Sequence, residues 1–210
     1  MNTTSAEQVA AYLLRVKAVK LDPEHPFTWA SGLKSPIYCD NRKTLSHPEA
    51  RSYIRDQFAR LIREKYPDAE LVAGVATGAI APGVLVAQEL GLPFAYVRLM
   101  PKEHGLENQI EGECRAGQRV VVLEDLISTG KSSLQAVKTL RDAGCEVMGM
   151  VAIFTYSLML ATNNFSRARC ALDTLSDYGT LIDLAARTGY VHPDEVVRLK
   201  QWRMNPDTYR

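Results

Sequence analysis

The chain has 210 residues and a formal net charge of +1, from 25 lysines and arginines against 24 aspartates and glutamates. Hydrophobic residues make up 46% of it and charged residues 23%, which is ordinary for a soluble globular protein and excludes a disordered chain. The balanced charge argues against a partner that needs a broad basic surface, so we expect no nucleic acid partner.

The N-terminal third predicts two helices separated by short extended pieces. Apolar residues recur at helical spacing over 5–16, where Ser5 is the expected N-cap. Prolines and a glycine stand among β-forming residues over 19–41, which favours short strands there. A second helix is expected over 48–65, with a proline at its first position after the candidate cap His47.

Strands and helices then alternate, and this alternation predicts the fold class. Apolar runs predict strands at 71–75, 94–97, 119–123, 147–154 and 170–175. Amphipathic patterns predict helices at 81–90, 131–143, 178–187 and 193–204. Because continuous apolar strands between amphipathic helices indicate a parallel sheet covered on both faces, we predict an α/β protein with a mostly parallel five-stranded sheet flanked by helices.

One connection, over 98–118, is longer than a strand-to-strand crossover needs and has little apolar periodicity. In doubly wound sheets, ligands bind outside the carboxyl ends of the strands, which is where this segment starts. Near Gly105 it carries two fixed cations, Arg98 and Lys102, and the titratable His104. Taken alone, the pattern also fits a solvated charged loop.

The sharpest local signal follows the strand at 119–123. Apolar residues lead into the adjacent carboxylates Glu124 and Asp125, and a Ser/Thr/Gly turn then opens a helix. Backbone N–H groups at such a turn, with the helix dipole behind them, suit a phosphate. The carboxylates would repel that phosphate unless they bind vicinal sugar hydroxyls or a hydrated Mg²⁺. A phosphorylated ribose supplies phosphate and diol together.

Two other interpretations compete with a phosphoribose site. Gly130, Lys131 and Ser132 match the last three positions of a P-loop, but that motif needs a glycine where this chain has Asp125. A plain strand–turn–helix, in which Glu124 and Asp125 only cap the helix, needs no ligand. The acidic pair directly after apolar residues favours a ligand site over both.

A loop of small residues, 74–83, follows the strand at 71–75. Its spacing is not G-x-G-x-x-G, so a dinucleotide fingerprint fails. Small residues here allow either the close approach of a ligand or tight packing of strand on helix, and both interpretations stay open.

The cysteine spacing and the apolar stretches indicate the cellular compartment of the protein. The four cysteines form no C-x-x-C pair, so neither a disulfide framework nor a zinc site is expected. The uncharged stretches 71–88 and 147–166 are interrupted by glycine, proline or polar residues, unlike a membrane-crossing helix. No signal-peptide pattern is present at the first residues. We therefore expect a cytoplasmic protein with reduced thiols and no membrane partner.

Three segments, in order, resemble the type I phosphoribosyltransferases, which bind 5-phosphoribosyl 1-pyrophosphate (PRPP). The stretch 123–133 resembles their PRPP signature, while 27–38 and 98–105 resemble the base-covering segment and the mobile catalytic loop of the orotate-using members. The resemblance implies the type I fold with a small hood. It implies one domain over 1–210, with N-terminal helices and hood in 1–69, an α/β core in 70–176 and C-terminal helices in 177–210.

The resemblance also implies site residues. The implied PRPP contacts are Arg98, Lys102, His104, Glu124, Asp125, Leu126, Ile127, Ser128, Thr129, Gly130, Lys131 and Ser132. Lys102, His104 and Asp125 take catalytic roles, and Ser128, Lys34 and Tyr38 contact orotate. Cations near the departing pyrophosphate stabilise its growing charge, and His104 is placed to donate a proton or hydrogen bond. Mg²⁺ is the expected cofactor, held mainly by substrate and water. A homodimer is implied, because the loop reaches the neighbouring subunit in the family.

The chain also departs from some family members. They carry a lysine in the pyrophosphate loop, where this chain has Thr77, Gly78 and Ala79, and another near position 30. They also carry an arginine after the fourth strand, which meets the orotate carboxylate, where residues 155–157 are Thr-Tyr-Ser. The expected activity is transfer of ribose 5-phosphate from PRPP to orotate, giving orotidine 5′-monophosphate (OMP) in pyrimidine synthesis. Transfer to another base and a regulatory PRPP-binding protein remain alternatives.

Overall fold

The computed structural model describes residues 3–29, 32–100, 109–206 and 209, and its centre is a six-stranded sheet. The strands lie in the order β10 (Leu172–Asp177), β9 (Glu146–Thr155), β8 (Arg119–Ile127), β5 (Leu71–Val75), β6 (Phe94–Val97) and β7 (Ile110–Glu111). The five longer strands are parallel, whereas β7 runs antiparallel to β6. The predicted α/β class with a mostly parallel sheet is confirmed, and β7 adds a sixth strand because residues 110–111 pair back along β6.

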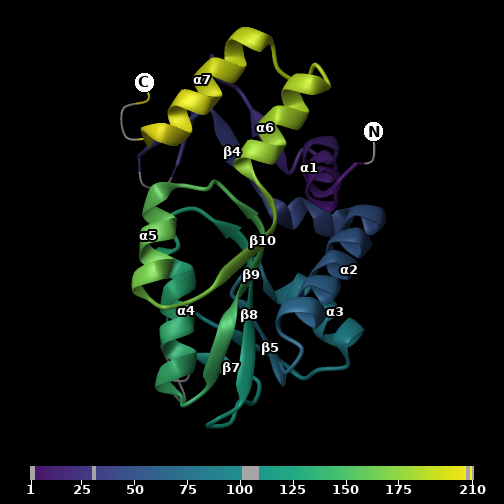
Figure 1. The fold of residues 1–210 in the computed structure, drawn as a ribbon, viewed down its shortest axis with the longest axis vertical. Coiled ribbons are helices and arrows are strands. Elements are labelled where there is room, and N and C mark those ends of the chain that lie inside the picture. The colour runs from purple at the N-terminus through teal and green to yellow at the C-terminus, as the bar shows by residue number, and fades with distance from the viewer. Residues whose placement is uncertain (1–2, 30–31, 101–108, 207–208, 210) are drawn as a thin grey trace.

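Side chains of the sheet alternate between two cores, one on each face. One core joins Val72, Val121 and Val151 to α1 (Ser5–Arg15), α2 (Pro48–Lys65), α3 (Ile80–Leu90), α6 (Tyr178–Arg187) and α7 (Pro193–Met204). The other joins Leu71, Val120 and Met150 to α4 (Lys131–Asp142) and α5 (Met159–Arg167). Figure 1 shows α4 and α5 on one side of the sheet and α2 and α3 on the other, with α1, α6 and α7 beyond one end.

The helix boundaries test the sequence signals closely. The bounds of α2, α6 and α7 are those predicted. The N-cap of α1 is Thr4 and not Ser5, because Thr4 Oγ1 accepts the Glu7 N–H at 3.2 Å while the Glu7 carboxylate accepts the Thr4 N–H at 2.9 Å. His47 precedes α2 but makes no side-chain capping bond. In the part of the chain that the structure describes, no helix is long and apolar enough to span a membrane.

Besides β7, three elements of the sheet and its flanking helices differ from the prediction by two residues or more. β8 extends four residues beyond the predicted strand and includes the acidic pair, because its pairing with β9 continues through Glu124 and Leu126. β10 both begins and ends two residues later than predicted. The helix α5 was not predicted, because its segment is rich in polar residues. It is stabilised by the packing of Ala161 and Phe165 into the core beside α4.

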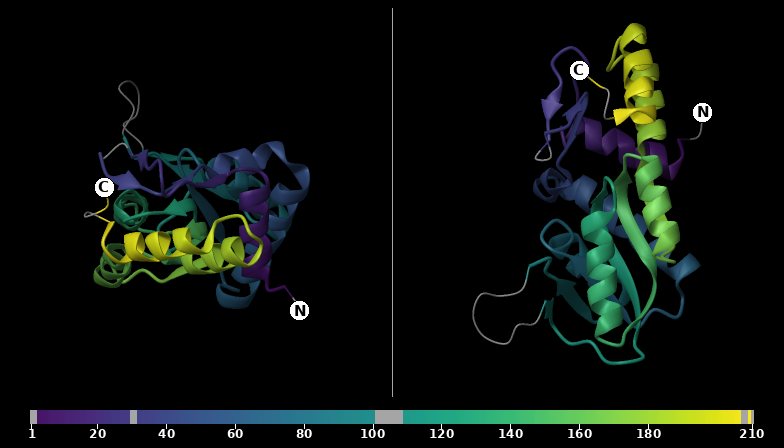
Figure 2. Two further views of the ribbon diagram at one scale, coloured as in Figure 1. Left: turned by 90° about the horizontal axis from the view of Figure 1, so that it is seen from above. Right: turned by 90° about the vertical axis from the view of Figure 1, so that its left-hand side faces the viewer.

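A small hood, residues 19–46, covers one end of the sheet. In it β1 (Val19–Leu21) pairs with β4 (Ile37–Cys39), β2 (Phe27–Thr28) pairs with β3 (Lys34–Ser35), and a 3₁₀ helix, η1 (Asn41–Ser46), follows. Figure 2 shows these hairpins beside α7. The Trp202 ring of α7 lies 5.8 Å from the Trp29 ring, and its Nε1 donates to the Lys34 carbonyl at 3.3 Å. The C-terminal helix therefore holds the hood in place.

Candidate active site

The segment 124–132, from the end of β8 to the start of α4, contributes to the walls of two cavities at the carboxyl end of the sheet. The first has a volume of about 400 Å³ and contains the acidic pair in its wall. It is lined by Cys39, Asp40, Arg42, Val75, Ala76, Thr77, Gly78, Leu99, Glu124, Asp125, Leu126 and Ser132. The second, of about 510 Å³, is more apolar and holds Ser128 and Thr129. We call them the polar cavity and the aromatic cavity.

The two carboxyl groups of the acidic pair occupy different surroundings. Glu124 is only 5% exposed, and its oxygens accept the Ser133 hydroxyl at 2.8 Å and the Asp125 backbone N–H at 2.9 Å. Burial, reinforced by the charge of Asp125, raises the pKa of Glu124 well above its ordinary value. Burial also raises the pKa of Asp125, which is less enclosed. Glu124 thus ties β8 to the first turn of α4, and Asp125 is the less buried member of the pair.

The loop after β5 combines both interpretations left open by its small residues. A Cβ at Gly78 would overlap the Asp125 carboxyl group, so glycine is required for Asp125 to stand where it does. At Gly83 a Cβ would lie 2.5 Å from the Phe94 ring, which reflects tight packing of α3 on the sheet. The Ala76–Thr77 peptide bond is cis. One end of the loop shapes the polar cavity, and the other packs the core.

The hood contributes residues that sequence reasoning missed. Asn41 is 1% exposed, and its side-chain amide donates to the Asp125 carbonyl at 2.6 Å. Arg42 Nε donates to Asp40 Oδ1 at 2.7 Å, and this hydrogen bond lowers the pKa of Asp40. Among the described residues that line the polar cavity, Arg42 is the one fixed cation. The polar run at 40–43 was the available signal, but it followed a segment interpreted only as short strands.

The turn that opens α4 has the form expected of an anion site. Gly130 is the N-cap with φ of 75°, and a Cβ there would lie 2.6 Å from the Phe165 ring. No side chain caps the first turn, which leaves its N–H groups for a ligand. The Asn164 side chain fixes the loop by donating to the Thr129 carbonyl at 2.9 Å. Lys131 is exposed at the start of the helix.

The aromatic cavity lies between the hood, the loop after β9 and the end of α7. It is lined by Trp29, Leu33, Ser128, Thr129, Leu158, Met159, Leu160, Arg203, Met204 and Pro206. The Trp29 ring lies 4.9 Å from the buried Tyr156 ring. Ser128, predicted to contact the base, is therefore in an apolar cavity with an aromatic wall.

Comparisons with known proteins agree with this geometry. The phosphoribosyl transferase domain family matches residues 43–163. A protein of Porphyromonas gingivalis named orotate phosphoribosyltransferase is 55% identical over 206 residues, which cover 98% of each chain. This chain belongs to the orotate phosphoribosyltransferase family. A solved orotate phosphoribosyltransferase from Aeropyrum pernix, 27% identical, covers 88% of this chain and 99% of its own, with a TM-score of 0.76.

A further solved structure supports the fold alone. The UMP synthase of Leishmania donovani is 24% identical, with a TM-score of 0.82. The match covers 96% of this chain and 42% of that longer one. The fold is thus shared with that structure over nearly the whole of this chain.

The remaining predicted site residues of this family member either lie outside the described residues or do not line the two cavities. Lys102 and His104 lie outside the described residues. Arg98 Nη1 is 3.7 Å from Glu111 Oε1, and Arg98 lines neither cavity. Lys34 donates to Thr28 Oγ1 at 2.7 Å, while Tyr38 is 41% exposed with its ring 5.7 Å from that of Phe27. Neither Lys34 nor Tyr38 lines the aromatic cavity.

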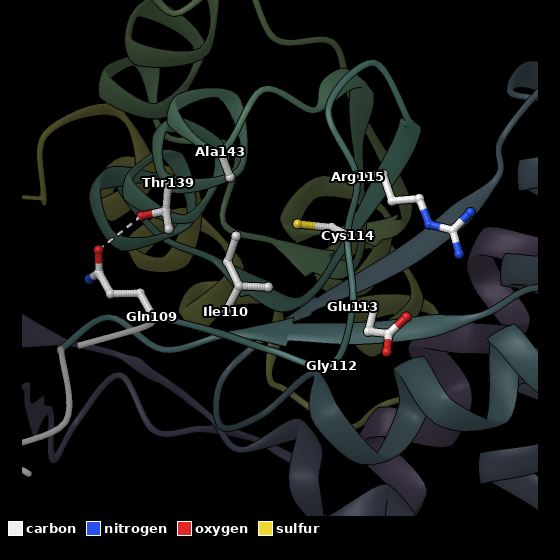
Figure 3. Close-up of a pocket in the computed structure, with 8 residues that line it drawn as sticks. All are labelled: Gln109, Ile110, Gly112, Glu113, Cys114, Arg115, Thr139 and Ala143. Carbon is white, nitrogen blue, oxygen red and sulfur yellow. Dashed lines mark hydrogen bonds between the residues drawn. The ribbon is translucent and has the colours of Figure 1, made fainter. Parts of the chain in front are cut away.

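A larger cavity, of about 560 Å³, lies elsewhere, beside β7 and the end of α4 (Figure 3). It is lined by Gln109, Ile110, Gly112, Glu113, Cys114, Arg115, Thr139 and Ala143. Between the residues drawn in Figure 3, the Thr139 hydroxyl donates a hydrogen bond to Gln109 Oε1 at 3.4 Å. None of the predicted site residues that the structure describes lines it, so size alone does not locate the active site of this orotate phosphoribosyltransferase family member.

Proposed function

We propose that this chain transfers ribose 5-phosphate from PRPP to orotate, giving OMP and pyrophosphate. The observation that carries the proposal is that one segment, 124–132, lines both cavities: Asp125 and Ser132 line the polar cavity, and Ser128 and Thr129 line the aromatic one. A transferase that joins a phosphorylated sugar to a planar base needs both environments, with the reacting carbon at their boundary.

The ribose 5-phosphate would bind at the end of β8. The Asp125 carboxylate faces the polar cavity, where its oxygens would accept hydrogen bonds from the ribose diol. The 5′-phosphate would bind the N–H groups of Gly130, Lys131 and Ser132, because the start of α4 carries partial positive charge. Glu124 supports both sites from within, through its bond to Ser133.

The diphosphate would lie in the rest of the polar cavity, between the loop 76–78 and the hood. Arg42 supplies a cation there, and its Nε bond to Asp40 orients the guanidinium. Lys102 and His104, as the family resemblance implies, would add charge and a proton donor when pyrophosphate leaves. The orotate ring nitrogen attacks C1, so no protein nucleophile is needed.

Mg²⁺ fits this donor set as a partner of the substrate. Within the described ranges, no group of three or more His, Cys, Asp or Glu side chains could hold a metal ion, whereas Asp125 offers carboxylate oxygens beside the diphosphate space. Asp125 would hold the ion, directly or through water, with substrate oxygens and water as its other ligands. When bound, the ion neutralises charge on the leaving diphosphate.

We further propose a cytoplasmic homodimer of single-domain subunits, in which the segment 98–105, which resembles the family's mobile catalytic loop, reaches the neighbouring subunit's site. The family resemblance of that segment supports this arrangement. In a mixture of a Lys102→Ala chain with a chain inactivated at Asp125, shared sites would restore part of the lost activity.

Incubating the purified protein with orotate, PRPP and Mg²⁺ tests the proposed activity. Orotate's ultraviolet absorbance should fall only when PRPP is present, and OMP should appear by chromatography. Uracil, adenine and hypoxanthine serve as comparison acceptors in the same assay. An unchanged absorbance with PRPP verified intact would refute the proposal, and preferential use of another base would reassign the acceptor.

A further inference from the structure

The aromatic cavity contains one charged side chain among the described residues that line it, Arg203 at the end of α7. We propose that Arg203 binds the carboxylate of the acceptor base and so selects an anionic base over a neutral one. This inference rests on the proposed function for the identity of the base, but it assigns a role to a helix that lies outside the residues matched by the domain family.

The position of Arg203 is determined by its neighbour. Trp202 is 1% exposed and its ring lies 5.8 Å from Trp29, 5.9 Å from Tyr156 and 5.4 Å from Tyr178. Because Trp202 is fixed in this cluster, the next residue is held where it lines the aromatic cavity. The Arg203 side chain also reaches the start of α6, where its Nη1 would be 4.0 Å from a Cβ at Gly179.

No other segment around the cavity supplies a cation among the described residues. Ser128 and Thr129 offer hydroxyls, and the residues after β9 that line it are Leu158, Met159 and Leu160. The preceding Tyr156 is buried against Trp29, and Thr155 Oγ1 donates to the Ile127 carbonyl at 3.4 Å. This side of the cavity is therefore neutral.

A planar anionic base needs what this cavity combines. The Trp29 ring gives a flat surface for stacking, and Ser128 gives a hydrogen-bonding hydroxyl. An ionised carboxylate moved into an apolar cavity loses hydration, and this loss must be offset by a cation. The guanidinium fork matches a carboxylate with two parallel hydrogen bonds, so arginine discriminates by shape as well as charge.

Two nucleotides that differ only in the carboxylate, OMP and UMP, isolate this interaction from the rest of the site. Calorimetry would measure the binding of each to the full-length protein, to Arg203→Ala and to Arg203→Lys. Arg198→Ala is the matched control, because Arg198 is exposed on the same helix and does not line the cavity. We expect Arg203→Ala to weaken OMP binding about 10- to 100-fold, as for the loss of a charged hydrogen bond, and to leave UMP binding within about twofold. Arg203→Lys should recover part of the loss, and Arg198→Ala should change neither nucleotide.

The other possible outcomes would overturn either the role of Arg203 or the proposed function. Equal loss of OMP and UMP binding in Arg203→Ala, or no loss of either, would overturn the role of Arg203. Unchanged UMP binding also reports an intact fold in the variant. If the wild-type protein binds OMP through Arg203 but does not consume orotate, the inference stands and the proposed function fails. If the wild-type protein consumes orotate and Arg203→Ala keeps the same orotate KM, the proposed function stands and the inference fails.

Discussion

Glu124 and Asp125 are adjacent, yet the strand directs their side chains to different tasks. Successive strand residues point to opposite sides, so Glu124 meets Ser133 of α4 while Asp125 meets Gly78 at the cavity. Glu124 therefore links β8 to α4, whereas Asp125 stands against the loop after β5 in the wall of the polar cavity. From the sequence alone the two acids look equivalent, because the predicted strand ends at residue 123, before both of them.

The buried carboxyl group of Glu124 predicts a pH dependence of stability. Burial raises the pKa of Glu124, so the folded chain keeps a proton that the unfolded chain releases above pH about 4.5. Rising pH therefore lowers the free energy of unfolding until the folded carboxyl ionises too. Glu124→Gln removes this contribution, and its stability relative to wild type should rise as pH increases above 4.5. Urea unfolding at several pH values between 4 and 8 would measure it, and a pH-independent difference would contradict the assignment.

Arg42 predicts a defect specific to the diphosphate. Arg42→Gln removes the one fixed cation among the described residues of the polar cavity, so the KM for PRPP should rise about 10-fold or more while the KM for orotate changes little. Inhibition by pyrophosphate should weaken in parallel. Lys43→Gln, at the adjacent exposed position outside the cavity, is the control. Equal effects of the two variants would mean that only general charge matters.

At the scale of elements, the loop 76–79 and α3 use two glycines for different purposes. Gly78→Ala pushes against Asp125, so kcat/KM should fall about 100-fold or more with a small change in Tm. Gly83→Ala pushes against the Phe94 ring, so Tm should fall while the KM for PRPP stays near the wild-type value. Thermal unfolding and steady-state kinetics on both variants would show the contrast. The same defect in both would reject this division of roles.

Most elements were predictable because their signals are local. The proline at the start of α2 and the apolar run of β5 give those bounds directly, and the segments of α6 and α7 were also placed correctly. α5 was missed because its stability comes from buried Phe165, a tertiary contact that helix propensity does not record. β7 was missed because two residues give too short an alternation, and its pairing with β6 decides its conformation.

The candidate site was predictable where one segment carries it. The stretch from Glu124 to Ser132 is continuous, so its chemistry is legible in the sequence. Asn41 and Arg42 lie more than eighty residues earlier, and Arg203 lies near the other end, so only the fold brings them to the cavities. Their roles depend on distances that no spacing rule encodes.

At the scale of the whole molecule, the hood and the C-terminal helix form one aromatic assembly over the sheet. Trp29, Tyr156 and Trp202 come from three distant segments and contact one another. Asn41 adds a polar link from the hood to β8. The net charge of +1 is compatible with this design, because a cation in each cavity serves one small anionic ligand without an extended basic surface.

The late position of α7 has a consequence for how the molecule is made. The N-terminus of a chain leaves the ribosome first, and domains fold as their segments emerge. Every described residue that lines the polar cavity lies between positions 39 and 132, whereas the lining of the aromatic cavity includes Arg203, Met204 and Pro206. During synthesis, the polar cavity therefore has all its described lining residues before the aromatic cavity can close, so the selectivity that we propose for Arg203 would be acquired late.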